Sequence, residues 1–169
     1  MEHLCLTENA DGVAAESVVI GTVDDEPFAV RYRIACDQKW RVKKVEIQPV
    51  GADHAIQLAS DGAGNWVDGS AAPLPRLRGA IDVDISATPF TNTLPIRRLS
   101  PRLGQPQEIL AVYVQVPSLS VITDRQRYTC LEESKRYRYE SVDSDFTRDI
   151  EVDEHGLVVN YPGLFRRAL

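Results

Sequence analysis

The side chains in this sequence whose types and spacing could carry chemistry are two acids followed closely by two cations. Asp82 and Asp84 are separated by one residue, and Arg97 and Arg98 come later in the same stretch. On a strand, side chains two apart point to the same side, and two carboxyl groups held close together raise the pKa of one of them. Asp82 and Asp84 could therefore serve as a general acid and base, like the paired carboxylates of glycosidases.

The same residues also have a purely structural interpretation. Either carboxylate could be neutralised by Arg97 or Arg98, or could bond to the backbone of the intervening loop. We favour this interpretation of the two acids, because nothing else in the sequence supplies a nucleophile or a leaving-group partner.

A strand and the loop after it must position these groups. Residues 81–85 alternate apolar and acidic side chains with a period of two, which predicts a strand with one apolar and one acidic face. From Thr88 to Leu99 this period disappears, Pro89 and Pro95 interrupt any ladder or helix, and short polar side chains can bond the local backbone. We therefore expect an ordered loop that ends at the two arginines.

The remaining chain is also rich in strand patterns. Residues 28–36 alternate cleanly, and residues 108–116 are apolar on both faces. The apolar positions of residues 40–50 change parity between Val42 and Val45, which we interpret as a bulge. No stretch of about ten residues has helical spacing. The sequence therefore predicts an all-β fold, with a single antiparallel sheet curled into a half-barrel or open barrel, little helix, and one domain over residues 1–169.

Several tyrosines lie in the later predicted strands. Such rings most often fill a core or form cross-strand pairs, but a row of them could also make a platform on which a sugar stacks. Both alternatives stay open for Tyr113, Tyr128, Tyr137 and Tyr139.

Composition narrows the range of partners. A formal net charge of −6, with 26% charged residues, argues against a nucleic-acid partner, because such partners are bound by basic surfaces. No apolar run approaches the roughly 20 residues of a membrane span, and the N-terminus lacks the pattern of a signal peptide. We expect no transmembrane segment and a cytoplasmic location.

The sequence offers no motif for a metal or a cofactor. It lacks a Gly-x-Ser-x-Gly elbow, a P-loop and a Gly-x-Gly-x-x-Gly fingerprint. Its histidines fall in unrelated segments, and its cysteines are far apart in strand-like segments, which predicts buried reduced thiols. These residues are His3, His54, His155, Cys5, Cys36 and Cys130. We expect no cofactor and no metal, and a binding protein rather than an enzyme.

Several segments carry a family resemblance. The string DVDI at residues 82–85, followed by TNTLPIRRL at residues 91–99, resembles the signature of a bacterial family described as putative glycolipid-binding proteins. Similar segments are the Asp61-Gly62 turn with Trp66, residues 112–114 with Pro117, residues 126–129 and 137–139, and the C-terminal residues 156–165. The resemblance implies a single β domain wrapped as a half-barrel, similar in shape to bacterial carriers of lipoproteins. It implies a concave apolar face for acyl chains, with polar groups at its mouth, and it brings no particular activity with it.

Our first hypothesis is a non-enzymatic carrier or sensor of a lipid or glycolipid. Inward-facing apolar side chains such as Ile34, Leu110 and Val112 would contact the acyl chain. The acids and Asn92 would accept sugar hydroxyls, and the two arginines would meet an anionic or hydroxylated head group. The candidate ligand-binding residues are Asp82, Asp84, Asn92, Arg97, Arg98, Tyr113, Tyr128, Tyr137 and Tyr139.

Two alternatives remain at this stage. The protein could be an enzyme acting on a sugar or lipid head group, with Asp82 or Asp84 as general acid or base. The loop could instead have no ligand and only pin the sheet closed, with Arg97 bonded to one of the acids. The size of any cavity, and whether the guanidinium groups point into it, distinguish these hypotheses. The identity of the ligand and the oligomeric state stay open.

Overall fold

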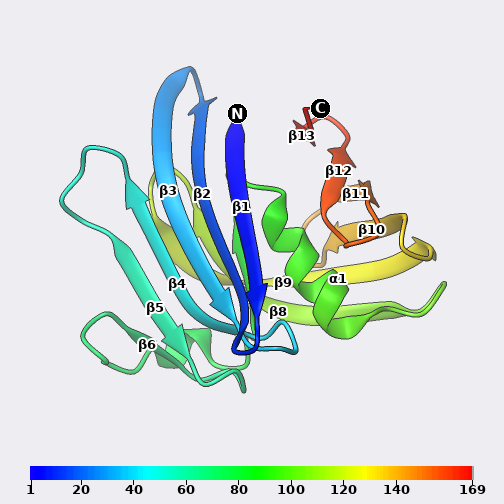
Figure 1. Ribbon diagram of the computed structural model, residues 1–169, viewed down its shortest axis with the longest axis horizontal. Coiled ribbons are helices and arrows are strands. Elements are labelled where there is room, and N and C mark those ends of the chain that lie inside the picture. The colour runs from blue at the N-terminus through cyan, green and yellow to red at the C-terminus, as the bar shows by residue number, and fades with distance from the viewer. Residues whose placement is uncertain (169) are drawn as a thin grey trace.

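The computed structural model describes residues 1–168, which form two β-sheets and a short α-helix (Figure 1). The first sheet is an antiparallel meander in which each strand pairs with the next along the chain. Its strands are β1 (Glu2–Asn9), β2 (Gly12–Val23), β3 (Glu26–Cys36), β4 (Val42–Pro49), β5 (Ile56–Ser60) and β6 (Trp66–Asp68).

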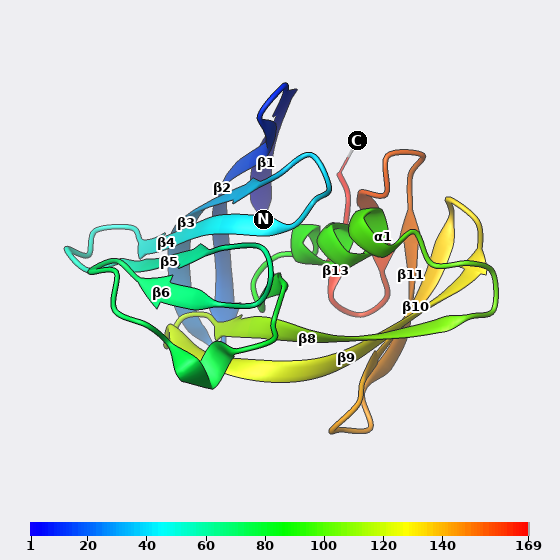
Figure 2. The ribbon, with the colours of Figure 1, turned by 90° about the horizontal axis from the view of Figure 1, so that it is seen from below.

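The second sheet curls into a half-barrel (Figure 2). Strands that follow one another pair antiparallel, except that β7 and β8 are parallel. The strands are β7 (Asp82–Ile85), β8 (Pro106–Gln115), β9 (Ser120–Glu132), β10 (Arg136–Ser141), β11 (Thr147–Val152), β12 (Val158–Tyr161) and β13 (Phe165–Arg166).

The all-β class and the half-barrel are confirmed, but the prediction of a single antiparallel sheet is wrong. The chain leaves the first sheet after β6 through an irregular segment that contains the 3₁₀ turn η1 (Pro75–Leu77), and it starts a new sheet at β7. Alternation identifies a strand and its buried face, but it does not say which sheet that strand joins.

The predicted loop after β7 contains the helix. A 3₁₀ turn, η2 (Phe90–Asn92), leads into α1 (Thr93–Leu99), so the expectation of an unbroken loop is wrong for those seven residues. A parallel pair such as β7 and β8 needs a crossover connection, and this segment supplies it. Pro95 does not prevent the helix, because it lies in the first turn, where backbone N–H groups have no partner within the helix. Within residues 1–168, no helix has the length and hydrophobicity needed to cross a membrane.

The crossover segment lies between the two sheets (Figure 2) and packs on both. Phe90 and Leu94 belong to the core shared with the first sheet, and Ile96 belongs to the core inside the half-barrel. On β7, Val83 and Ile85 are buried in the shared core, which confirms the apolar face predicted for this strand. The two acids of β7 consequently face the concave side of the half-barrel.

The bulge predicted within residues 40–50 is confirmed. Cys36 pairs with Val42 and Ala35 pairs with Lys44, so β4 has one extra residue opposite β3. The bulge lets Val42 and Val45 both be buried despite their different parity.

A tight contact fixes the start of β7. The Trp66 indole N–H donates a hydrogen bond to the Ala80 carbonyl (2.8 Å), and the Gly79 N–H donates one to the Gly64 carbonyl (2.8 Å). A Cβ atom on Gly64 would lie 2.8 Å from the Gly79 Cα, so this approach requires glycine. The turn between β5 and β6 thus positions the strand that carries the two acids.

A single carboxylate joins the first sheet to the segment after β7. Glu2 accepts hydrogen bonds from the buried hydroxyls of Tyr32 (2.7 Å) and Thr88 (2.8 Å). This contact holds the edge strand β1 against the residues that follow β7.

The three cysteines are free. Cys36 and Cys130 are buried, as predicted, but the prediction is wrong for Cys5. Cys5 is exposed because β1 is the edge strand of the first sheet and this side chain lies on its outer face.

Candidate functional site

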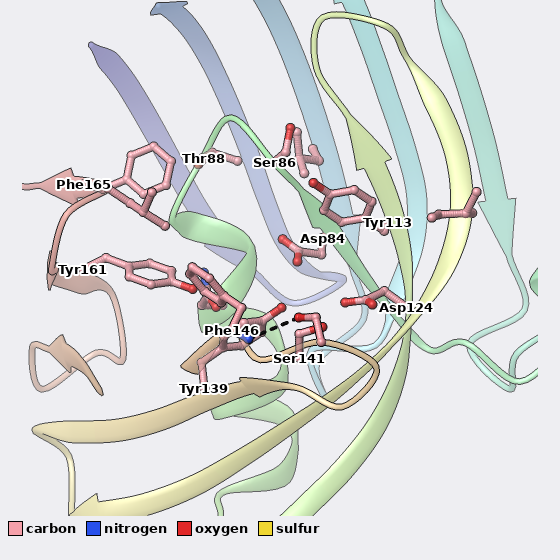
Figure 3. A pocket seen from close by; sticks show the side chains of 15 residues that line it. Asp84, Ser86, Thr88, Tyr113, Asp124, Tyr139, Ser141, Phe146, Tyr161 and Phe165 are labelled. Carbon is pink, nitrogen blue, oxygen red and sulfur yellow. Dashed lines mark hydrogen bonds between the residues drawn. The ribbon is translucent and has the colours of Figure 1, made fainter. Parts of the chain in front are cut away.

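The concave side of the half-barrel contains an open cavity of about 370 Å³ (Figure 3). It lies where β7, β8 and β9 meet the hairpins formed by β10 to β13. Its polar lining comprises Asp84, Ser86, Thr88, Asn92, Tyr113, Asp124, Tyr139, Ser141, Ser144 and Tyr161, and its apolar lining comprises Ile85, Ile122, Phe146, Leu164 and Phe165.

Asp84 is the polar centre of this cavity (Figure 3). Its carboxylate accepts hydrogen bonds from the Thr91 hydroxyl (2.9 Å) and from the Gln126 amide (2.7 Å). Burial raises the pKa of Asp84, the charge of Asp124 adds to the rise, and the two hydrogen bonds oppose it. Asp84 is therefore a half-buried carboxyl group, and its hydrogen-bond donors among residues 1–168 are neutral.

Gln126 connects Asp84 to a second acid that the sequence analysis missed. The Gln126 side-chain nitrogen also donates a hydrogen bond to Asp124 (3.0 Å), so a single buried amide bridges the two carboxyl groups. The sequence did indicate that these two side chains lie together, because Asp124 and Gln126 share one face of β9. That signal could be used only once the pairing of β9 with β8 was known.

Aromatic side chains form one side of the cavity, and most of them were also missed. Tyr139, Phe146, Tyr161 and Phe165 follow one another at centroid separations of 5.9, 6.5 and 6.1 Å, with steep angles between their planes. Burial raises the pKa of the Tyr139 and Tyr161 hydroxyls, and the charge of Asp84 raises both further, so they remain hydrogen-bond donors at neutral pH. Three of the four rings lie on strands beyond Ser141 or in their turns, where the sequence analysis singled out no site residue.

The cavity has a polar floor and an apolar rim. Thr88 and Asn92 are 2% and 4% exposed, whereas Ile122 and Leu164 are 55% and 53% exposed although they line the same cavity. The rim therefore presents large apolar side chains to solvent beside a buried set of polar groups.

Asp82 has a different role from Asp84. Its carboxylate is 1% exposed and accepts hydrogen bonds from two nitrogens of Arg98, with 2.9 Å to Arg98 Nε. Burial raises the pKa of Asp82, and the guanidinium opposes that rise. This bidentate pair fastens α1 to β7. It is the contact that the structural interpretation predicted, made by Arg98.

Arg97 lies away from the cavity of Asp84. Its guanidinium lies 4.9 Å from the centroid of the Trp40 ring and donates a hydrogen bond to the His155 carbonyl (3.3 Å). Arg97, Arg98 and Tyr137 line a separate groove of about 690 Å³, whose other walls carry both acidic and basic side chains.

The candidate residues therefore divide into three sets. The structure brings Asp84, Asn92, Tyr113 and Tyr139 together around the 370 Å³ cavity. It places Arg97, Arg98 and Tyr137 at the second groove. Asp82 and Tyr128 are buried and line neither space, and the Tyr128 hydroxyl donates a hydrogen bond to Asn92 (3.0 Å).

The expectation that Ile34, Leu110 and Val112 line an acyl cavity is wrong. Ile34 and Val112 are buried in the core shared by the two sheets, and Leu110 packs against that core. The error follows from the single-sheet prediction, because the first sheet packs on the face of the half-barrel that carries Val112, and these side chains form the core between the two sheets. Within residues 1–168, no group of three or more His, Cys, Asp or Glu side chains is placed to hold a metal ion.

The fold and cavity define a class of protein: two β-sheets, one of them a half-barrel that opens a small polar cavity with an apolar rim. The chain belongs to the family described as "putative glycolipid-binding", whose model matches residues 1–167, so the family predicted from the sequence is confirmed. It is similar to the crystal structure of a DUF1089 family protein from Pseudomonas aeruginosa, with 35% identity and a TM-score of 0.85. That similarity covers 99% of this chain and 92% of the other. No curated protein matches the chain.

Proposed function

We propose that this protein binds the head group of a lipid or glycolipid in the 370 Å³ cavity, as a carrier or sensor that performs no chemistry. The observation that carries the proposal is the combination of a half-buried carboxyl group, Asp84, with an aromatic and apolar rim in one open cavity. The description of the family supports the same class of ligand.

The exposed fractions of the lining residues indicate how a ligand would be oriented in the cavity. Buried polar groups such as Thr88 and Asn92 would hydrogen-bond a head group, and the exposed Ile122 and Leu164 would lie against the start of its hydrocarbon chain. Covering exposed apolar surface stabilises a complex by about 25 cal/mol per Å². The head group would thus enter first and the tail would leave across the rim, the reverse of the orientation expected from the sequence.

The size of the cavity limits what enters it. Ligand pockets commonly span about 300–1,000 Å³, and 370 Å³ lies at the low end of that range. A single sugar ring or a head group of similar size fits this volume better than several acyl chains do.

A pair of matched variants tests the proposal. Titrating the protein with a neutral alkyl glycoside, below its micelle concentration, should give saturable binding in a calorimeter. Ile122→Ser should weaken that binding about fivefold, as expected for about 1 kcal/mol of lost apolar contact. Ile20→Ser is the control, because Ile20 is equally exposed (57%) but lies on β2, away from the cavity.

Native mass spectrometry gives an independent check. Protein isolated from cells without detergent should carry a non-covalent adduct of lipid mass. If only bare protein is found, and no glycoside or fluorescent fatty acid binds in titrations, the proposal is wrong.

A second candidate function is an enzyme acting on a sugar or lipid head group, with Asp84 as general acid or base. The raised pKa of Asp84 and the neighbouring Asp124 favour it, since such pairs carry acid and base catalysis. A screen of glycosides and esters should then detect turnover that Asp84→Asn abolishes without loss of binding. Activity that survives Asp84→Asn would contradict this candidate.

A further inference from the structure

As far as residues 1–168 are concerned, the lining of the 370 Å³ cavity is acidic and contains no cation. Of its 15 lining residues, two are acids, Asp84 and Asp124, and none is Lys, Arg or His. Both acids accept hydrogen bonds from the neutral amide of Gln126. Among the described residues 1–168, neither takes part in an ion pair.

Several acids elsewhere in the molecule are paired with a cation. Asp82 pairs with Arg98, Asp149 pairs with Arg138, and Glu108 pairs with Arg127. A carboxylate held out of water is costly unless a cation compensates it. A positive charge on a ligand would therefore be stabilising beside the two acids of the cavity.

The aromatic side of the cavity suits the same kind of ligand. In Figure 3, Tyr139, Phe146 and Tyr161 lie on one side of Asp84, and Asp124 lies on the other. Rings at steep angles to one another can surround a cation, which is how quaternary ammonium groups are commonly recognised. The cluster already holds one cation, because the Arg148 guanidinium lies 4.7 Å from the centroid of the Phe146 ring, outside the cavity lining.

We infer that the cavity selects a cationic head group, such as the ammonium of an amino sugar or a quaternary ammonium, over neutral and anionic head groups. Asp84 and Asp124 supply the countercharge, and the faces of Tyr139, Phe146 and Tyr161 contact the substituents of the ammonium. The inference rests on the proposed function, because it names the ligand class of that same cavity.

Three amphiphiles with one alkyl chain test the selectivity. The probes are dodecyltrimethylammonium, dodecyl glucoside and dodecyl sulfate, each titrated below its micelle concentration at physiological salt. The cationic probe should bind about tenfold more tightly than the neutral one, and the anionic probe should bind most weakly. Glucosamine and choline carry the cationic group without an alkyl chain. Measurable binding of either would show that the ligand can be a free cation and that a lipid tail is dispensable.

Matched variants distinguish the effect of the cavity acid on binding from the effect of the protein's net negative charge. Asp84→Asn should weaken binding of dodecyltrimethylammonium about tenfold, and it should weaken binding of the glucoside by a smaller factor. Asp11→Asn removes the same charge in the exposed turn after β1 and should change neither. Should Asp84→Asn fail to fold, Tyr161→Leu should still weaken binding of the cationic probe, and Tyr161→Phe, which keeps the ring, should not.

The outcomes distinguish this inference from the proposed function. Glucoside binding without preference for the cation, or equal effects of Asp84→Asn and Asp11→Asn, overturns the inference and leaves the proposed function intact. Absence of binding for every probe overturns both.

Discussion

Asp82 and Asp84 occupy the same face of the same strand, one residue apart, yet they lie in opposite electrostatic environments. Asp82 is buried in an ion pair with Arg98 at the end of α1, and 1% of its side chain is exposed. Asp84 faces an open cavity and, within the described part of the chain, accepts hydrogen bonds only from Thr91 and Gln126, which are neutral. The strand therefore carries one acid that holds the fold together and one that is free to meet a ligand.

The different environments of Asp82 and Asp84 show how a short segment can serve both stability and binding. The crossover between β7 and β8 brings α1 back onto β7, and the helix reaches the first acid of the strand but not the second. The second acid is left in the cavity of the half-barrel, together with Tyr113 and Tyr139. A motif that contains two acids and two arginines thus yields one ion pair and one cavity acid, and the remaining cation, Arg97, lies on Trp40.

The largest expected effect comes from breaking the ion pair. Arg98→Met leaves Asp82 buried without a countercharge, and breaking such a pair typically costs about 3–5 kcal/mol in the free energy of unfolding. Urea denaturation followed by circular dichroism at neutral pH measures the change. Arg138→Met is the matched control: its pair with Asp149 is 44% and 39% exposed, and its loss should cost less than about 1 kcal/mol. Equal losses for the two variants would show that the Asp82 contact is no more important than a surface pair.

A medium effect should follow from removing the amide between the cavity acids. Gln126→Leu leaves Asp84 and Asp124 without their shared donor, and an unsatisfied buried polar group costs about 1–3 kcal/mol. In an Asp84→Asn background the penalty should shrink, because one of the two acids is already neutral. A double-mutant cycle by urea denaturation measures this coupling, which for contacting residues is about 0.5–3 kcal/mol.

Gln48 provides the control for that cycle. Its side-chain nitrogen donates a hydrogen bond to the Ala52 carbonyl (3.1 Å), and it lies on β4, in the other sheet from the two acids. Gln48→Leu should show no coupling to Asp84→Asn. Coupling of similar size at both positions would mean that the amide bridge has no special role.

Local pattern was sufficient to predict most strands of this fold. The alternation of residues 81–85 correctly assigned Val83 and Ile85 to a core, and the parity change near Val42 correctly indicated a bulge. The helix was missed because it is seven residues long, too short to show an apolar period, and because Pro95 was taken as a breaker when it lies in a tolerated position. The division into two sheets was missed because period-two patterns carry no information on strand partners.

The candidate site was predictable only where its residues are local in sequence. Asp84 and Asn92 were found because they lie in one distinctive stretch, together with Tyr113 on the paired strand. Asp124 and Gln126 are on β9, and they join Asp84 only through the register of three strands. No single-sequence argument supplies that register, so the cavity acid nearest to Asp84 stayed hidden until the structure was known.

The smallest effect on the free energy of unfolding is expected for Asp84→Asn, and the sign of its pH dependence is definite. Burial raises the folded-state pKa of Asp84 above its ordinary value of 3.8, so the folded protein holds this proton more tightly than the unfolded chain does. By linkage, the stability that Asp84 contributes is fully present below its unfolded pKa and is lost as the pH rises through its folded pKa. Because asparagine does not titrate, the stability of the variant relative to that of the natural protein should increase as the pH rises above about 4.

The change in the free energy of unfolding on substitution by asparagine distinguishes the two acids of β7. At neutral pH, Asp84→Asn should change the unfolding free energy by less than about 1 kcal/mol, because it breaks no ion pair and keeps one of the two oxygens that accept hydrogen bonds. Asp82→Asn should lose stability instead, because it leaves the guanidinium of Arg98, 14% exposed, without its partner. Urea denaturation of both variants across this pH range gives the two curves. If Asp84→Asn were as destabilising as Asp82→Asn at neutral pH, Asp84 would be a structural acid too, and its place in an open cavity would need another explanation.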